Sequence, residues 1–142
     1  MSRARRAVAV PAVLAALALA GCGPSSTPEQ QSHNEQTVEA IADGLAGDLP
    51  GVTVDTATFR DDAESDAKVY LFLRCDGCRE DRVVDRAVRA LWRSTVTPLH
   101  TFSVRVVDSD DLGEARRDVV VSAEEAALVD ELGERPVPSS TG

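Results

Sequence analysis

The chain contains few of the side chains that most often carry catalysis. Its 142 residues include two histidines, three cysteines, one lysine and five aromatic residues. General acid–base catalysis has few candidates when histidine is this scarce. The sequence also shows no Ser/His/Asp set, no phosphate-binding glycine loop and no isolated carboxylate pair in an apolar context. These absences favour a protein that is not an enzyme and that has neither catalytic residues nor a cofactor.

Metal ligands are scarce as well. Zinc takes four ligands, and only two histidines, His33 and His100, accompany the two closely spaced cysteines. The acidic segment Asp108–Glu114 half resembles a calcium loop, but Leu112 occupies a position that needs an oxygen ligand. We therefore expect no metal site, and we interpret this acidic segment as a solvated turn.

Basic side chains are outnumbered by acidic ones. The chain has 15 lysines and arginines against 24 aspartates and glutamates, which gives a formal net charge of −9. An acidic protein repels the phosphates of DNA and RNA. We therefore expect no nucleic-acid partner.

Only one long apolar run is present, and it lies near the start of the chain. Arg3, Arg5 and Arg6 precede a run of 14 mainly Ala, Val and Leu residues over 7–20. A positive segment, an apolar segment and small residues at a cleavage site are typical of an export signal. A membrane-spanning helix needs about 20 apolar residues. The sequence therefore predicts a cleaved signal peptide over 1–21, and its removal leaves a domain with a net charge of −12.

The end of this run carries the motif Leu19-Ala20-Gly21-Cys22. It resembles the lipobox of bacterial lipoprotein signals, which reads Leu, a small residue, Gly or Ala, then Cys. The resemblance implies that Cys22 receives a diacylglyceryl group and becomes the first residue after cleavage. Two acyl chains are enough for stable anchoring. The implied location is the extracytoplasmic face of the cell membrane; an ordinary signal peptide that leaves Cys22 free is the alternative.

Composition divides the rest of the chain into three parts. Residues 22–34 are rich in Pro, Ser, Thr and Gln without apolar periodicity, and they predict a lipid-anchored flexible tether. Residues 136–142 predict a disordered tail of the same character. Between them, 35–135 contain the periodic apolar residues of one small domain.

Apolar periodicity predicts the elements of this domain. We expect a helix with a Ser32/Glu35 capping box, strands over Val52–Phe59 and Lys68–Arg74, a helix over Glu80–Ser94, strands near Phe102–Val106 and Asp118–Val121, and a last helix with a Ser122/Glu125 capping box. The order α-β-β-α-β-β-α predicts an α+β two-layer sandwich. It has one mixed sheet of about four strands with the helices on one face.

Cys75 and Cys78 form the one constellation with evident chemical content. They follow a predicted strand and precede a predicted helix, as in thioredoxin-like redox motifs. Asp76 between them opposes thiolate formation, and export to an oxidising compartment favours a disulfide. Two hypotheses therefore remain. The favoured one is a structural disulfide or a pair of inert thiols, and the other is a redox-active pair.

An arginine row accompanies the clearest helix. Arg82, Arg86, Arg89 and Arg93 lie opposite its apolar stripe. Such a row can meet lipid phosphates or an acidic partner, but it is more often the solvated face of a helix.

The central part of the chain, Leu45 to Val107, resembles a group of uncharacterised actinobacterial lipoproteins. The matching segments are Leu49-Pro50-Gly51-Val52, Leu91-Trp92-Arg93-Ser94, Pro98-Leu99 and Phe102-Ser103-Val104-Arg105-Val106. The group implies no specific activity. We therefore expect a membrane-anchored extracytoplasmic lipoprotein with a small binding or envelope-accessory domain for an unknown envelope protein or ligand. The alternatives are a thiol–disulfide oxidoreductase that uses Cys75 and Cys78, and an adhesion protein.

Overall fold

The order of helices and strands is the one expected from the sequence. The computed structural model describes residues 26–62, 65–110 and 112–137. Its elements are α1 (Pro28–Asp48), β1 (Val52–Asp62), β2 (Ser65–Cys75), α2 (Glu80–Trp92), β3 (Thr101–Asp108), β4 (Glu114–Val120) and α3 (Val121–Leu132). The α+β class and the order α-β-β-α-β-β-α are thereby confirmed.

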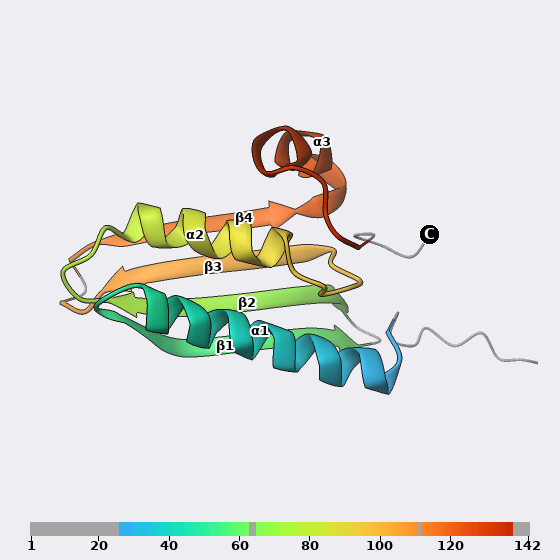
Figure 1. The fold of residues 1–142 in the computed structure, drawn as a ribbon, viewed down its shortest axis with the longest axis horizontal. Coiled ribbons are helices and arrows are strands. Elements are labelled where there is room, and N and C mark those ends of the chain that lie inside the picture. Colours follow the sequence, from blue (N-terminus) through green and yellow to red (C-terminus); the bar gives the residue numbers. More distant parts are fainter. Residues whose placement is uncertain (1–25, 63–64, 111, 138–142) are drawn as a thin grey trace, which may run out of the picture.

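The four strands form one mixed sheet in the order β1-β2-β3-β4 (Figure 1). The pairs β1–β2 and β3–β4 are antiparallel, and β2 and β3 are parallel. A parallel pair needs a crossover connection, which here contains the amphipathic helix α2. Because β2 lies inside the sheet, Val69, Leu71 and Leu73 on its inward side are fully buried.

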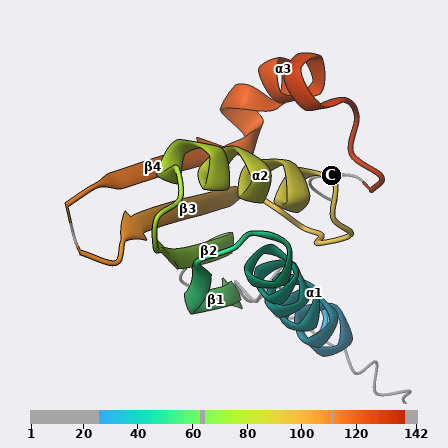
Figure 2. The same cartoon turned by 60° about the vertical axis from the view of Figure 1, so that its left-hand side comes forward.

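Helices α1 and α2 lie side by side over one face of the sheet (Figures 1 and 2). The apolar stripe of α2 points into the core, as its 3.6-residue period predicts. It consists of Val83, Val84, Ala87, Val88, Leu91 and Trp92. Helix α3 lies beyond the edge strand β4, where the indole N–H of Trp92 donates to the carbonyl oxygen of Gly133 at 2.7 Å.

The opposite face of the sheet carries charged and aromatic side chains. The guanidinium groups of Arg74 and Arg105 lie 5.7 and 5.0 Å from the ring centre of Phe72. Arg74 pairs with Asp55 on β1, and Arg105 pairs with Glu114 on β4. These contacts connect all four strands, and they cover the aromatic ring of a central strand without a second helical layer.

Helix α1 begins earlier than the sequence pattern predicts. Its first residue is Pro28, so residues 28–34 of the predicted tether 22–34 are helical. Asn34 is buried and fixes this part of the helix: its side chain donates to Thr97 O at 2.9 Å and accepts from Thr97 N at 3.2 Å. The tether prediction was wrong over 28–34. The polar composition of this stretch gave no sign of a helix, which is held in place by the buried side-chain amide of Asn34.

The cap of α1 differs from the predicted one for a related reason. Thr27 Oγ1 accepts from Gln30 N at 3.2 Å, and the Gln30 side chain accepts from Thr27 N at 2.8 Å. The expected capping box of Ser32 and Glu35 is wrong, because both residues lie inside the helix. Pro28 marks the true start, since proline is favoured at the first helical position.

The last strand is longer than predicted. β4 occupies Glu114–Val120, whereas we expected a short strand over Asp118–Val121. Along this strand only Val119 is fully buried. Its charged residues pair within the sheet, as Arg105 with Glu114 shows. The strand is therefore specified by its neighbour β3 rather than by its own apolar alternation.

Helix α3 follows β4 without an intervening loop. Its N-cap is Val120, whose backbone N–H donates to the Glu124 side chain at 3.3 Å. The expected Ser122/Glu125 capping box is therefore wrong. The helix starts two residues earlier than this capping box predicts, and its first residue, Val121, is buried in the core.

The anchor predictions concern residues that the structure does not describe. The signal peptide over 1–21, the lipidation site Cys22 and residues 138–142 of the predicted tail lie outside the described residues. Among the described residues, no helix is both long enough and apolar enough to cross a membrane. The anchor therefore remains a prediction from the sequence.

Candidate functional site

The two paired cysteines lie in a tight turn between β2 and α2. The structure joins Cys75 and Cys78 in a disulfide, with their Cα atoms 5.7 Å apart, within the usual range for such bridges. The Asp76 N–H donates to Gly51 O at 2.8 Å, which ties this turn to the start of β1. A Cβ atom at Gly51 would lie 2.2 Å from Asp76 O, so glycine is required where the two turns meet.

The surroundings of the disulfide do not favour a reactive thiolate. Cys75 is 1% exposed, so the sulfur that would attack a substrate in a thioredoxin-like motif is covered. The half-buried Cys78 is the more accessible of the two. Asp76 lies between them, and Glu80 and Asp81 occupy the first turn of α2. These three acidic side chains oppose a thiolate at the buried Cys75, whereas Arg79 and Arg82 line the same hollow as Cys78.

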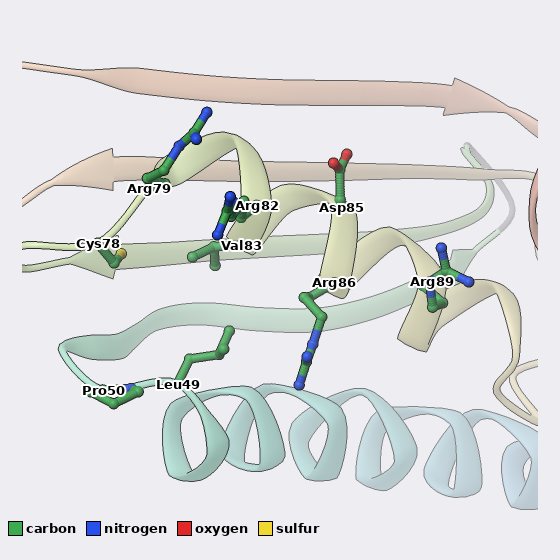
Figure 3. Close-up of a pocket in the computed structure, with 9 residues that line it drawn as sticks. All are labelled: Leu49, Pro50, Cys78, Arg79, Arg82, Val83, Asp85, Arg86 and Arg89. Atoms are coloured by element: carbon green, nitrogen blue, oxygen red, sulfur yellow. The ribbon is translucent and has the colours of Figure 1, made fainter.

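A groove runs beside the disulfide, between α1 and α2 (Figure 3). Its first hollow has a volume of about 480 Å³. It is lined by Leu49, Pro50, Cys78, Arg79, Arg82, Val83, Asp85, Arg86 and Arg89. Figure 3 shows the Arg86 side chain reaching towards α1, whereas Asp85 points to the other side of α2.

The groove continues along the two helices. A second hollow of about 320 Å³ is lined by Ile41, Gly44, Leu45, Asp48, Arg86, Arg89, Ala90 and Arg93. Because both hollows include Arg86 and Arg89, we treat them as one feature, the helix groove. Its lining combines aliphatic side chains with a row of guanidinium groups.

Most of the positive charge of the helix groove is not neutralised by the domain. Arg79 pairs with Asp81 at 3.0 Å, and Arg93 donates to Leu132 O at 3.2 Å. Arg82, Arg86 and Arg89 are exposed, and none of them forms an ion pair with another described residue. The groove is thus a positive surface on a protein with a net charge of −9.

The structure separates the other residues considered as ligands. His33, on α1, lies within hydrogen-bond distance of Thr95 Oγ1, at 3.1 Å. His100 directly precedes β3, and the disulfide follows the far end of the adjacent strand β2. Among the described residues, no group of three or more His, Cys, Asp or Glu side chains is placed to hold a metal ion. The turn at Asp108 is stabilised internally, because its carboxylate accepts from Asp110 N at 2.9 Å.

The sequence located the arginine row but not the groove. The spacing of the arginines predicts one face of α2, and the structure agrees. The hollow itself depends on the C-terminal half of α1, whose Ile41, Gly44 and Asp48 come from a distant part of the chain. No local sequence pattern predicts that α1 packs beside α2.

Comparison with known proteins gives no match to any family model, curated protein or solved structure. The features of this chain that bear on function are the Leu19–Cys22 motif, the disulfide turn and the helix groove. Of these, the helix groove is the described feature best suited to binding, because it is hollow, accessible and charged opposite to the rest of the protein.

Proposed function

We propose that this protein is an extracytoplasmic lipoprotein, anchored through Cys22, whose folded domain is a non-enzymatic binding module. The contact surface of the module is the helix groove, and its partner carries acidic groups. The observation that carries this proposal is the unneutralised row of Arg82, Arg86 and Arg89 along a groove with aliphatic walls.

The anchor fits the start of the fold. The Ser26 hydroxyl donates to the Asp61 carboxylate, and Ser26 is buried, so the domain is fixed from this residue onward. Four residue steps from Cys22 to Ser26 span at most about 14 Å. A lipid on Cys22 would therefore hold the domain close to the membrane surface.

The groove suits an acidic partner for electrostatic reasons. Arginine binds carboxylates and other oxyanions through two parallel hydrogen bonds. Complementary charge raises the rate of association and selects among partners more than it raises affinity. An acidic domain with one positive groove therefore repels acidic proteins in most orientations and attracts them in one.

The anchor is tested by metabolic labelling. Cells that express the full chain are grown with radiolabelled palmitate, and the protein is isolated. We expect label in the wild-type chain and none in Cys22→Ala, because that thiol is the acceptor. Label that persists in Cys22→Ala would disprove the anchor.

The contact surface is tested by comparative capture from the solubilised cell envelope. The variant Arg82→Gln/Arg86→Gln removes two groove charges, and Arg60→Gln/Arg116→Gln removes two exposed charges elsewhere. We expect wild type and the second variant to retain acidic proteins that the first variant loses. Equal capture by all three chains would reject the groove as the contact surface.

A thiol–disulfide oxidoreductase is the second candidate, favoured by one observation: Cys78 lines the helix groove. In that reaction the reduced pair transfers two electrons and two protons to a substrate disulfide, and Cys75 and Cys78 close to their own disulfide. Insulin reduction in the presence of dithiothreitol measures it. Turnover that disappears in Cys78→Ser would support this candidate over the binding module, and turnover no faster than with dithiothreitol alone would exclude it.

A further inference from the structure

We infer that the acidic partner of the helix groove is a second copy of this chain, which docks its α1 on the arginine row of α2. This inference rests on the proposed binding role of the groove and names its partner. The resulting dimer has a two-fold axis parallel to the two helices and places the helical layers face to face.

Charge is divided within the helical layer. Exposed side chains of α2 include Arg82, Arg86 and Arg89, which are unpaired within the described residues. The neighbouring α1 exposes Glu39 and Asp43, four residues apart, and these carboxylates also form no ion pair with a described residue. One layer therefore presents a row of arginines on α2 next to a pair of carboxylates on α1.

The spacing of the two rows also agrees. Side chains three or four residues apart on a helix lie about 5–6 Å from each other along its surface. Arg82, Arg86 and Arg89 follow this spacing on α2, as do Glu39 and Asp43 on α1. An acidic helix is thus a ligand whose charges repeat at the same interval as the arginine row.

The symmetry of a dimer also favours this contact. The two helices are antiparallel, because Leu49 after α1 meets Arg79 before α2 in one hollow, and His33 near the start of α1 meets Thr95 after α2. A face-to-face dimer has two simple two-fold axes. An axis in the interface plane and perpendicular to the helices would place α1 on α1 and α2 on α2 of the second copy. Like charges would then face each other. An axis along the helices places α1 of each copy on α2 of the other, and so opposes unlike charges twice.

The start of the folded domain is compatible with the same axis. A two-fold axis along the helices leaves Ser26 of both copies at the same end of the dimer. The lipids proposed on both Cys22 residues could then enter one membrane. The axis favoured by charge is therefore also the axis that a pair of anchored molecules can adopt.

The exposed face of α1 leaves room for such an approach. Gly44 and Gly47 lie in the helix, and a Cβ atom at either position would meet nothing within 4 Å. Intramolecular packing therefore does not require glycine there. The charge pairs remain exposed at the rim, so each contributes little, and salt screens them. Anchoring in one membrane raises the effective concentration of the partner, which makes a weak interface sufficient.

The test is energy transfer between mature, lipidated chains that begin at Cys22 and are reconstituted in phosphatidylcholine vesicles. Donor and acceptor dyes are attached to Lys68, the only lysine, which lies on the sheet face away from the helices. We expect transfer at low salt that falls at least about twofold at 1 M NaCl, where the screening length is about 3 Å. Transfer that is absent at low salt would overturn the dimer.

Charge reversal identifies the interface. Arg86→Glu/Arg89→Glu opposes acid to acid, and Glu39→Arg/Asp43→Arg opposes base to base, so each variant alone should lose transfer. Mixed together, the two variants present unlike charges at both contacts of the two-fold dimer, and transfer should return. Arg60→Glu/Arg116→Glu is the control of equal charge change away from the groove, and it should keep the wild-type signal.

The outcomes separate this inference from the proposed function. Failure of the mixed variants to regain transfer, with native circular dichroism in both, would reject the second copy as the partner. Capture of an acidic envelope protein that depends on Arg82 and Arg86 would leave the binding module standing in that case. Flotation of the same vesicles reports whether the chain is anchored at all.

Discussion

At the scale of single residues, Arg135 illustrates how a charged side chain can close the core. Its guanidinium group donates to Leu91 O at 3.3 Å and Trp92 O at 3.1 Å, and it also donates to Val96 O. The same group lies 5.4 Å from the Trp92 ring centre. Burial lowers the pKa of Arg135 to about 10, so the side chain remains protonated at neutral pH. It donates to the Trp92 carbonyl at the end of α2 and to the Val96 carbonyl in the segment that follows, and it shares the Leu91 carbonyl with Ser94.

We predict that Arg135→Met lowers the free energy of unfolding by about 2 kcal/mol. Methionine keeps an apolar contact with Trp92 but leaves the carbonyl groups without their donor. Urea denaturation followed by Trp92 fluorescence measures the change. Arg60→Met, at an exposed position, should alter stability by less than about 0.5 kcal/mol. Equal effects of the two substitutions would refute this role of Arg135.

Asp118 gives a prediction that depends on pH. The Ser103 hydroxyl donates to its carboxylate, and Arg116 Nε lies 2.8 Å from it. The Ser103 hydrogen bond, followed by the contact with Arg116, lowers the pKa of Asp118 below its ordinary value. Because the folded pKa is the lower one, this contact stabilises the fold above the unfolded pKa of about 3.9. The stabilisation is lost as pH falls through the folded pKa.

We predict that Ser103→Ala raises the pKa of Asp118 towards about 3.9, the ordinary value of aspartate. Carboxyl carbon chemical shifts recorded against pH measure it directly. Arg116→Gln should raise the same pKa, because it removes the second donor. An unchanged pKa in Ser103→Ala would show that the hydroxyl does not stabilise the carboxylate.

At the scale of elements, the start of α1 is the clearest case in which local patterns compete. Two similar segments could cap this helix, Thr27 with Gln30 and Ser32 with Glu35. The structure uses the first, with Pro28 at the beginning of the helix. Proline cannot donate a backbone hydrogen bond, so the first turn is where it costs least.

We predict that Thr27→Ala lowers the free energy of unfolding by about 1 kcal/mol, the usual effect of removing an N-cap. Ser32→Ala should leave stability nearly unchanged, since Ser32 is exposed within the helix. Thermal denaturation of both variants provides the comparison. If Ser32→Ala lowers stability more than Thr27→Ala does, the helix begins at the predicted Ser32 cap and not at Thr27.

The strands show the same competition between local pattern and pairing. β2 is recognisable in the sequence because its apolar residues fill a central position in the sheet. β4 is not, because its alternating charges form contacts such as Arg105–Glu114 and Arg116–Asp118. A charged edge strand can be predicted only when the strand that it pairs with is known. A buried strand can be predicted from its own run of apolar residues.

At the scale of the whole molecule, the early start of α1 shortens the segment between the proposed lipidation site and the folded domain. The predicted tether of 13 residues becomes four residue steps from Cys22 to the buried Ser26, at most about 14 Å. Ser26 and Lys68 lie at the same end of the domain, since Ser26 bonds to Asp61 at the end of β1, and Lys68 pairs with Arg60.

We predict strong energy transfer from a dye on Lys68 to headgroup-labelled lipids in vesicles that carry the anchored protein. Insertion of 20 Gly/Ser residues after Pro24 should reduce transfer, because a flexible linker of that length adds roughly 25 Å of mean separation. Cys22→Ala should abolish transfer. If the insertion leaves transfer unchanged, the membrane does not hold the domain through the segment before Ser26.

The sequence by itself determined the fold class, the order of the elements, the inward face of α2, and the pairing candidates Cys75 and Cys78. These features follow from apolar periodicity and short spacings, which are local. Tertiary structure alone decided the helix groove, the burial of Cys75, the extent of β4 and the true start of α1. Each of these depends on contacts between segments far apart in the chain, such as Asn34 with Thr97, and local composition carries no information about such contacts.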